Sequence, residues 1–279
     1  MNTSKNHHYV HESYQKRFYS QDKKLYVILK KDRYRVQETT AARICYIPYL
    51  NTIEFENNKF EGIETFYRNI ESKLAEILLE IDLINNEYCG IFGNVVSEEE
   101  GQLLFKTMIA LMFWRNPNQT VIAEKYIDSI LEVYDAAHSE AKKMIGFDRK
   151  TIKFFQKNIK KESIRKFVQF VLLPIFTFKI YETSCAIRSF STNGDILITC
   201  DNPIIFNEDI SKLFSFEDFI MPVDSGRFFS SEQSRLSKLN ISKINRLLAD
   251  KAESYVLGSD RKYLEDLSNV LKNISNISK

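Results

Sequence analysis

The strongest constraint on the fold is a helical repeat of apolar residues between residues 63 and 84. Apolar side chains recur there at intervals of three and four residues, which places them on one face of an α-helix. The members of this face are Ile63, Phe66, Tyr67, Ile70, Leu74, Ile77, Leu78 and Ile81. A helix with one long apolar face must bury it, so we expect it to pack against other helices or a sheet.

Residues that form turns are scarce in the rest of the chain. Only 8 Gly and 5 Pro occur in 279 residues, which is too few for the many turns of an all-β protein. Further helices are predicted over residues 97–115, 119–145, 149–173, 236–256 and 260–275. A capping box of Ser97 and Glu100 predicts where the first of them begins. Pro174 predicts the end of the third.

Short β-like segments lie at both ends of the sequence. They cover residues 25–29, 34–37, 51–55, 181–189, 196–199, 204–206, 219–223 and 227–230. The prediction is therefore an α+β, helix-rich fold, in which N-terminal and C-terminal strands form one mixed or antiparallel sheet around a central helical bundle. We expect one domain over 1–279, because no Gly-, Pro- or Ser-rich linker divides it. Its parts are a β and short-helix part (1–60), a helical part (61–175) and a C-terminal part (176–279).

Several classes of protein are disfavoured. The most apolar window, residues 167–180, is shorter than the roughly 20 residues of a membrane span and contains Lys179, so we expect no membrane segment. The four cysteines form no CxxC pair, which is typical of reduced thiols in the cytoplasm. No Gly-rich phosphate-binding motif is present, so no nucleotide cofactor is expected.

Positive charge is concentrated in two stretches, although the net charge is only +2. Residues 16–35 carry eight Lys and Arg against two Asp, interleaved with aromatic residues. Residues 148–166 carry eight Lys and Arg against Asp148 and Glu162. Such stretches can bind nucleic acid, but they are also typical of solvent-exposed helix faces. A protein partner or a homo-oligomer is an open alternative.

Three of the four histidines lie within residues 7–11. If this segment is helical, His7 and His11 share one face at a spacing that suits metal ligation. The more ordinary interpretation is polar surface near a chain end, and the glutamate of the zinc motif is missing. We favour His8 as a single buried or catalytic imidazole.

Two carboxylates and an arginine are the next candidates. Glu64 and Glu71 are seven residues apart, so they project from one helix face beside the apolar residues. They either pair with a cation, bind a metal, or lie at the surface. Arg115 follows an apolar run and precedes Pro117, so it either finds a carboxylate or phosphate partner or caps its helix.

The segment ILITCDNPIIF, residues 196–206, interrupts an apolar strand with Asp201, Asn202 and Pro203. Asp and Asn at a strand end can line an active site at the mouth of a sheet. They can equally form a local turn, since Pro203 cannot donate to a β-ladder.

Four stretches taken together resemble a known family. They are HHYVHESYQKRF, IETFYRNIESKLAEIL, ALMFWRNP and ILITCDNPIIF, and in this order they resemble the family DUF4238 over residues 6–265. The chain departs from its pattern at His11, where proline is common, and at Cys200, where serine is common. The resemblance implies functional positions at His8, Glu71, Arg115, Asp201, Asn202 and Asn245, and a bacterial, defence-associated setting, but no reaction.

Two functions follow from these residues. The first is a phosphodiesterase or nuclease, in which Glu71 and Asp201 hold Mg²⁺ or Mn²⁺ or act as general base. Arg115 would stabilise phosphate charge, Asn202 would orient the attacking water or a phosphate oxygen, and His8 would join Glu71 and Asp201 as a metal ligand or general base. The second is a non-enzymatic sensing or interaction module, in which Asp201 and Arg115 form a structural ion pair between sheet and helices.

Overall fold

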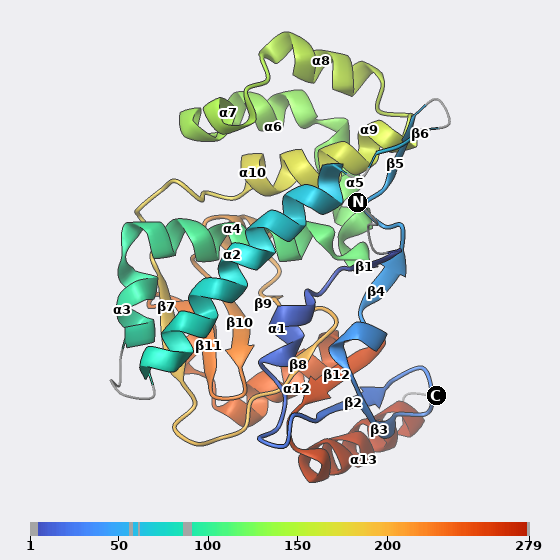
Figure 1. Cartoon of the computed structure of the whole chain (residues 1–279), viewed down its shortest axis with the longest axis vertical. Helices are drawn as coiled ribbons and strands as arrows, with labels where there is room; N and C mark the ends of the chain where they lie inside the picture. The colour runs from blue at the N-terminus through green and yellow to red at the C-terminus, as the bar shows by residue number, and fades with distance from the viewer. Residues whose placement is uncertain (1–4, 56–57, 61, 86–90, 278–279) are drawn as a thin grey trace.

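The computed structural model of the chain describes residues 5–55, 58–60, 62–85 and 91–277. The fold is α+β, as predicted, with helices α5–α10 above the larger sheets in the view of Figure 1. The strands are β1 (Asn6–His8), β2 (Leu25–Leu29), β3 (Arg35–Thr39), β4 (Tyr46–Pro48), β5 (Ile53–Phe55), β6 (Asn58–Phe60), β7 (Ile187–Ser191), β8 (Thr199–Cys200), β9 (Ile205–Phe206), β10 (Phe219–Asp224), β11 (Arg227–Ser231) and β12 (Tyr255–Gly258). The helices are α1 (Glu12–Lys16), α2 (Gly62–Asn85), α3 (Ile91–Ser97), α4 (Glu99–Arg115), α5 (Thr120–Asp128), α6 (Ile130–Ala136), α7 (Ser139–Ile145), α8 (Arg149–Lys157), α9 (Glu162–Phe167), α10 (Leu173–Thr177), α11 (Ile210–Phe214), α12 (Ile241–Lys251) and α13 (Arg261–Ile277).

The described strands form two four-stranded antiparallel sheets and two smaller pairs, β1–β4 and β5–β6. One sheet has the order β3-β2-β12-β8 and joins strands from the two ends of the chain, as predicted. In its centre Val256 lies opposite both Ile28 and Cys200. The other sheet, β7-β11-β10-β9, contains C-terminal strands alone, so two sheets stand where we predicted one.

The strand β12 was not predicted, because residues 236–256 read as one helix. The helix α12 ends at Lys251, and its last carbonyl groups accept hydrogen bonds from Lys30 Nζ, at 2.8 Å for Ala249 and 2.5 Å for Ala252. The chain then turns and continues as the central strand Tyr255–Gly258. A cation that caps a helix from a distant part of the chain leaves no local sequence signal.

The two long helices predicted after α4 are broken into shorter ones. Residues 119–145 form α5, α6 and α7, and residues 149–173 form α8, α9, a π-helical turn (Val168–Leu172) and the start of α10. Pro174 does not end a helix but lies in the first turn of α10, where proline needs no N–H donor. The carbonyl of Phe170, four residues before this proline, instead accepts a hydrogen bond from Tyr67 Oη at 2.8 Å.

The helix α4 begins one residue later than the capping box implied. Ser97 is the last residue of α3, and its hydroxyl donates to the Gly93 carbonyl, so it does not cap α4. From Met108 to Arg115 every residue of α4 is buried. The helix α2 packs across α4 (Figure 1). Arg115, the last residue of α4, therefore lies inside the protein.

Candidate functional site

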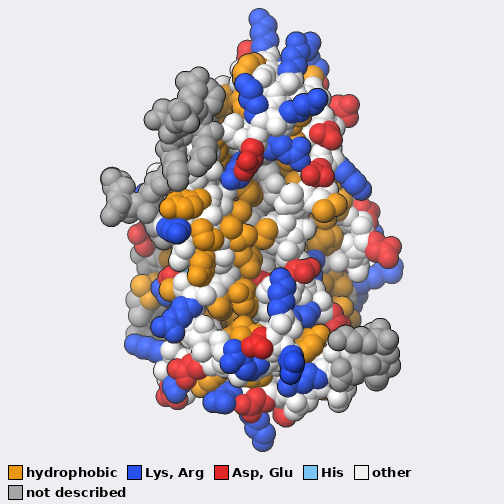
Figure 2. Space-filling view, turned by 90° about the vertical axis from the view of Figure 1, so that its right-hand side faces the viewer, with side chains coloured by type: hydrophobic (Ala, Val, Ile, Leu, Met, Phe, Trp, Pro, Cys, Tyr) orange, Lys and Arg blue, Asp and Glu red, His pale blue; other side chains and the backbone are white. Residues whose placement is uncertain are grey.

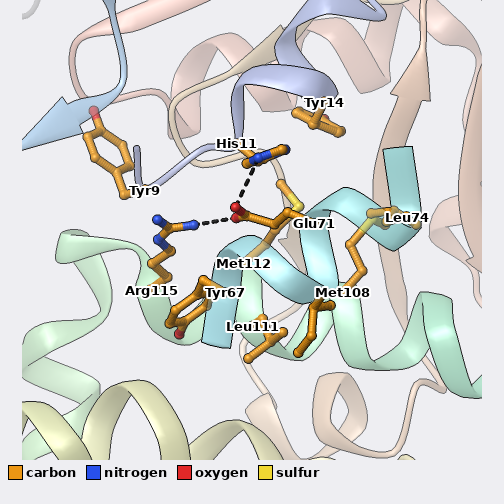
Figure 3. Close-up of a pocket in the computed structure, with 11 residues that line it drawn as sticks. Tyr9, His11, Tyr14, Tyr67, Glu71, Leu74, Met108, Leu111, Met112 and Arg115 are labelled. Carbon is orange, nitrogen blue, oxygen red and sulfur yellow. Dashed lines mark hydrogen bonds and ion pairs between the residues drawn. The ribbon is translucent and has the colours of Figure 1, made fainter. Parts of the chain in front are cut away.

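Arg115 is the centre of a buried polar network between α4, α2 and the segment that precedes α1 (Figure 3). The helix α4 ends at this residue because Asn116, before Pro117, adopts extended backbone angles. Arg115 is only 2% exposed, so its charge requires partners. Its guanidinium donates to Glu71 Oε1 and, at 3.2 Å, to Glu64 Oε2.

The helix α2 supplies three of the groups around Arg115. Glu64, Tyr67 and Glu71 are three and four residues apart, so they project from one face, as predicted for the two carboxylates. The guanidinium carbon of Arg115 lies 4.4 Å from the centre of the Tyr67 ring. Burial alone would raise the pKa of the Glu71 carboxyl, but Arg115 and His11 outweigh it and hold that pKa below its ordinary value.

The remaining partners come from the N-terminal segment. His11 caps α1, since its Nδ1 accepts the backbone N–H of Ser13 at 3.2 Å, and its Nε2 lies 2.9 Å from Glu71 Oε2. Because Nδ1 accepts, the proton on Nε2 points at the carboxylate. Both nitrogens of the His11 ring are therefore engaged. The Asn51 side chain donates to Glu64 Oε2 at 2.6 Å, and its backbone N–H donates to His7 Nδ1 at 3.0 Å.

The helical arrangement of His7 and His11 that would suit a metal is not formed. His7 lies in the extended strand β1, which pairs with β4, whereas His11 lies at the start of α1. The two imidazoles approach different carboxylates, Glu64 and Glu71. Among the described residues, no group of three or more His, Cys, Asp and Glu side chains is arranged to hold a metal ion.

The cavity beside Arg115 is small. Its free volume is about 20 Å³, which is room for about one water molecule. Arg115 Nε is buried without a hydrogen-bond partner in the described part of the chain, so a water here would satisfy it. A cavity of this size does not hold a nucleotide.

Asp201 lies outside this network. Its carboxylate accepts hydrogen bonds from three successive backbone N–H groups, those of Glu253 (2.9 Å), Ser254 (2.7 Å) and Tyr255 (3.2 Å). It thereby fixes the turn between α12 and β12. Burial raises the pKa of Asp201 above its ordinary value, although these hydrogen bonds lower it. Its backbone carbonyl accepts from Asn116 Nδ2, next to Arg115. Asp201 and Arg115 therefore lie close together, but their charged groups have different partners, so the ion pair predicted between them is not formed.

The side chains of the other candidates also have hydrogen-bond partners within the fold. Asn202 Oδ1 accepts from Gln119 at 3.3 Å, and His8 Nε2 lies 3.2 Å from the Ala41 carbonyl oxygen. Asn245 joins α12 to residues 196–198 through its amide, with Oδ1 accepting from Ile198 N–H at 3.1 Å. Cys200 is fully buried, and burial together with Asp201 raises the pKa of its thiol. The remaining described cysteines, Cys45 and Cys185, are buried free thiols, and Cys89 lies outside the described residues.

The basic stretch 148–166 forms α8, α9 and the turn between them. Lys150, Lys153, Phe154 and Lys157 recur at helical spacing and lie on one face of α8; we name this set the α8 stripe. All four are exposed, Phe154 at 55%. The opposite face is buried through Ile152. Figure 2 shows Lys and Arg side chains gathered at the top of the molecule, the end at which α8 lies in Figure 1.

The stretch 16–35 is organised differently. Arg17 is held between Asp82 and Asp224, Lys30 caps α12, and Phe18 is fully buried. Its strands β2 and β3 lie at the end of the molecule opposite α8 (Figure 1), so the two basic stretches do not form one surface.

Comparison with known proteins identifies a family. A family model described as "Protein of unknown function (DUF4238)" matches residues 6–262. No curated protein and no solved structure matches the chain. No described helix is long and apolar enough to cross a membrane. Since the family model covers most of the sequence, the chain belongs to the DUF4238 family.

Proposed function

We propose that this protein is a non-catalytic recognition module that binds single-stranded nucleic acid through the α8 stripe. The observation that supports this function is the combination of three exposed lysines with an exposed aromatic ring on one helix face. Lysines neutralise phosphates, and an exposed aromatic ring stacks on unpaired bases. In the described part of the chain none of these lysines has an ion-pair partner, whereas the adjacent Arg149 is paired with Asp135.

The packing of α8 favours nucleic acid over a membrane surface. A membrane-binding amphipathic helix inserts its apolar face into the lipid. That face of α8 is already used inside the protein, where Ile152 is fully buried and the Phe155 ring lies 5.6 Å from Phe147 and 5.5 Å from Phe167. Phe154 is the apolar side chain of the stripe itself, and one ring suits base stacking better than lipid insertion.

Phosphodiester hydrolysis with Mg²⁺ or Mn²⁺ stays a prediction with less support. The Asp201 carboxylate is occupied by backbone N–H groups, and Glu71 by Arg115 and His11. Incubating labelled RNA and DNA with MgCl₂ or with EDTA tests it. Metal-dependent cleavage that disappears in Glu71→Gln would favour hydrolysis.

Binding is tested by fluorescence anisotropy with unstructured RNA and DNA oligonucleotides. The variant Lys150→Gln/Lys153→Gln/Lys157→Gln removes the charge of the α8 stripe. Each phosphate contact contributes about 0.7 to the slope of log Kd against log salt concentration. Losing three contacts is therefore expected to weaken binding roughly 100-fold at 0.1 M salt. The control Lys31→Gln/Lys243→Gln/Lys262→Gln removes the same charge from other exposed positions. Equal loss in both variants, or binding to anionic vesicles alone, would refute the proposal.

A further inference from the structure

A second site lies beside α9, separate from the α8 stripe. An open cavity of about 500 Å³ separates α2 from α9 and the end of α8. Its walls are almost wholly apolar, and its main side chains are Ile63, Phe66, Phe155, Ile164, Phe167 and Val171. Its volume falls in the range of small-molecule sites, which are typically concave and mostly apolar. The polar network at Arg115 has no comparable space.

A polar cavity adjoins the apolar one at Ser163. It has a volume of about 220 Å³ and is also lined by Lys166, Thr52, Tyr49 and Glu162. Lys166 Nζ lies 3.1 Å from Glu162 Oε1 and donates to the Thr52 carbonyl at 3.4 Å. Glu162 is 81% exposed, so its pairing with Lys166 is easily exchanged for another anion.

Thr52 adds a second polar group to the polar cavity. It is 3% exposed, and its hydroxyl has no hydrogen-bond partner among the described residues. An unsatisfied buried hydroxyl is costly, so an acceptor that reaches it gains affinity. A polar cavity with a lysine, next to an apolar cavity, is complementary to a ligand with an anionic head and an apolar body.

We propose that this cavity binds a free long-chain carboxylate. The alkyl chain lies along Phe66, Ile164 and Phe167, and the carboxylate replaces Glu162 at Lys166, beside Thr52. A flat aromatic ligand without charge would leave Lys166 and Thr52 unused. A partner helix would present several side chains to the apolar walls but no single anion at Lys166. The inference is independent of the proposed nucleic-acid binding, since none of the α8 stripe lines the cavity.

Isothermal titration calorimetry with octanoate, decanoate and dodecanoate, each below its micelle concentration, tests the site. Each added methylene is expected to raise affinity about fourfold, because one buried CH₂ contributes that much transfer free energy. Affinities that do not depend on chain length, or no binding of any of the three, would overturn the proposal. Uptake from anionic phospholipid vesicles alone would point to a membrane surface instead and would also overturn it.

Two variants locate the ligand. Lys166→Gln is expected to weaken dodecanoate about tenfold and to leave dodecanol unchanged, because a partly desolvated ion pair is lost only for the acid. Phe66→Glu is expected to weaken both. The control Lys160→Gln removes an exposed charge that does not line either cavity. If Lys166→Gln and Lys160→Gln behave alike, the head group is not at Lys166 and the proposal fails.

Discussion

Replacing Arg115 tests whether the buried network is structural. Arg115→Met keeps most of the side-chain volume but leaves Glu64 and Glu71 facing each other without their cation. Removing one partner of a buried ion pair typically costs 3–5 kcal/mol. Both carboxylates keep 15% exposure and retain neutral donors, so we expect a loss near the lower limit, about 3 kcal/mol, or roughly 150-fold in the folding equilibrium.

Neutralising the carboxylates should restore stability. In Arg115→Met/Glu64→Gln/Glu71→Gln no buried charge remains, and each new amide can still accept from Asn51 or His11. Uncharged groups of similar volume often replace a buried ion pair without loss. We expect the triple variant to recover at least about 2 of the 3 kcal/mol.

Urea unfolding followed by circular dichroism measures these differences at neutral pH. Glu71→Gln alone serves as a control, because it leaves Arg115 paired with Glu64. A loss below about 1 kcal/mol in Arg115→Met would show that solvent already compensates the carboxylates. A triple variant as unstable as the single one would refute the charge argument altogether.

Three further outcomes are expected. Asp201→Ala should destabilise the fold by about 3 kcal/mol in urea, because three backbone N–H groups lose their acceptor; a fully stable variant would contradict the structural role. Burial lowers the pKa of Lys251 from 10.5 to about 8. Between these two pH values the unfolded chain binds more protons than the folded protein, so the free energy of unfolding should rise with pH from 8 to 10.5. Lys251→Met should remove that rise and add about 3 kcal/mol at pH 7, and an unchanged pH profile would count against it. Phe154→Ala should weaken oligonucleotide binding about tenfold through lost stacking, without changing thermal stability; unchanged affinity would exclude stacking.

Part of this structure could be read from the sequence because it depends on local periodicity. The apolar face of α2 and the placement of Glu64 and Glu71 on one side of it follow from helical spacing alone. Burial of Arg115 follows from the apolar run before it and the proline after it. These features need no knowledge of distant contacts.

The partners of the polar groups could not be read in the same way. His11, not His8, contacts Glu71. The reason is that β1 pairs with β4 and holds His8 in a strand, whereas His11 lies at the start of α1. Asp201 resembled an active-site carboxylate because its three N–H partners lie more than fifty residues later in the chain. The capping of α12 by Lys30, just before the unpredicted strand β12, is equally nonlocal.

The salt dependence of oligonucleotide binding tests the central claim most directly. A plot of log Kd against log salt concentration, measured by anisotropy for the wild type and for Lys150→Gln/Lys153→Gln/Lys157→Gln, gives the number of phosphates contacted. Three lost contacts predict that the slope falls by about 2 in the variant. Identical slopes for the two proteins would contradict the assignment of nucleic-acid binding to the α8 stripe.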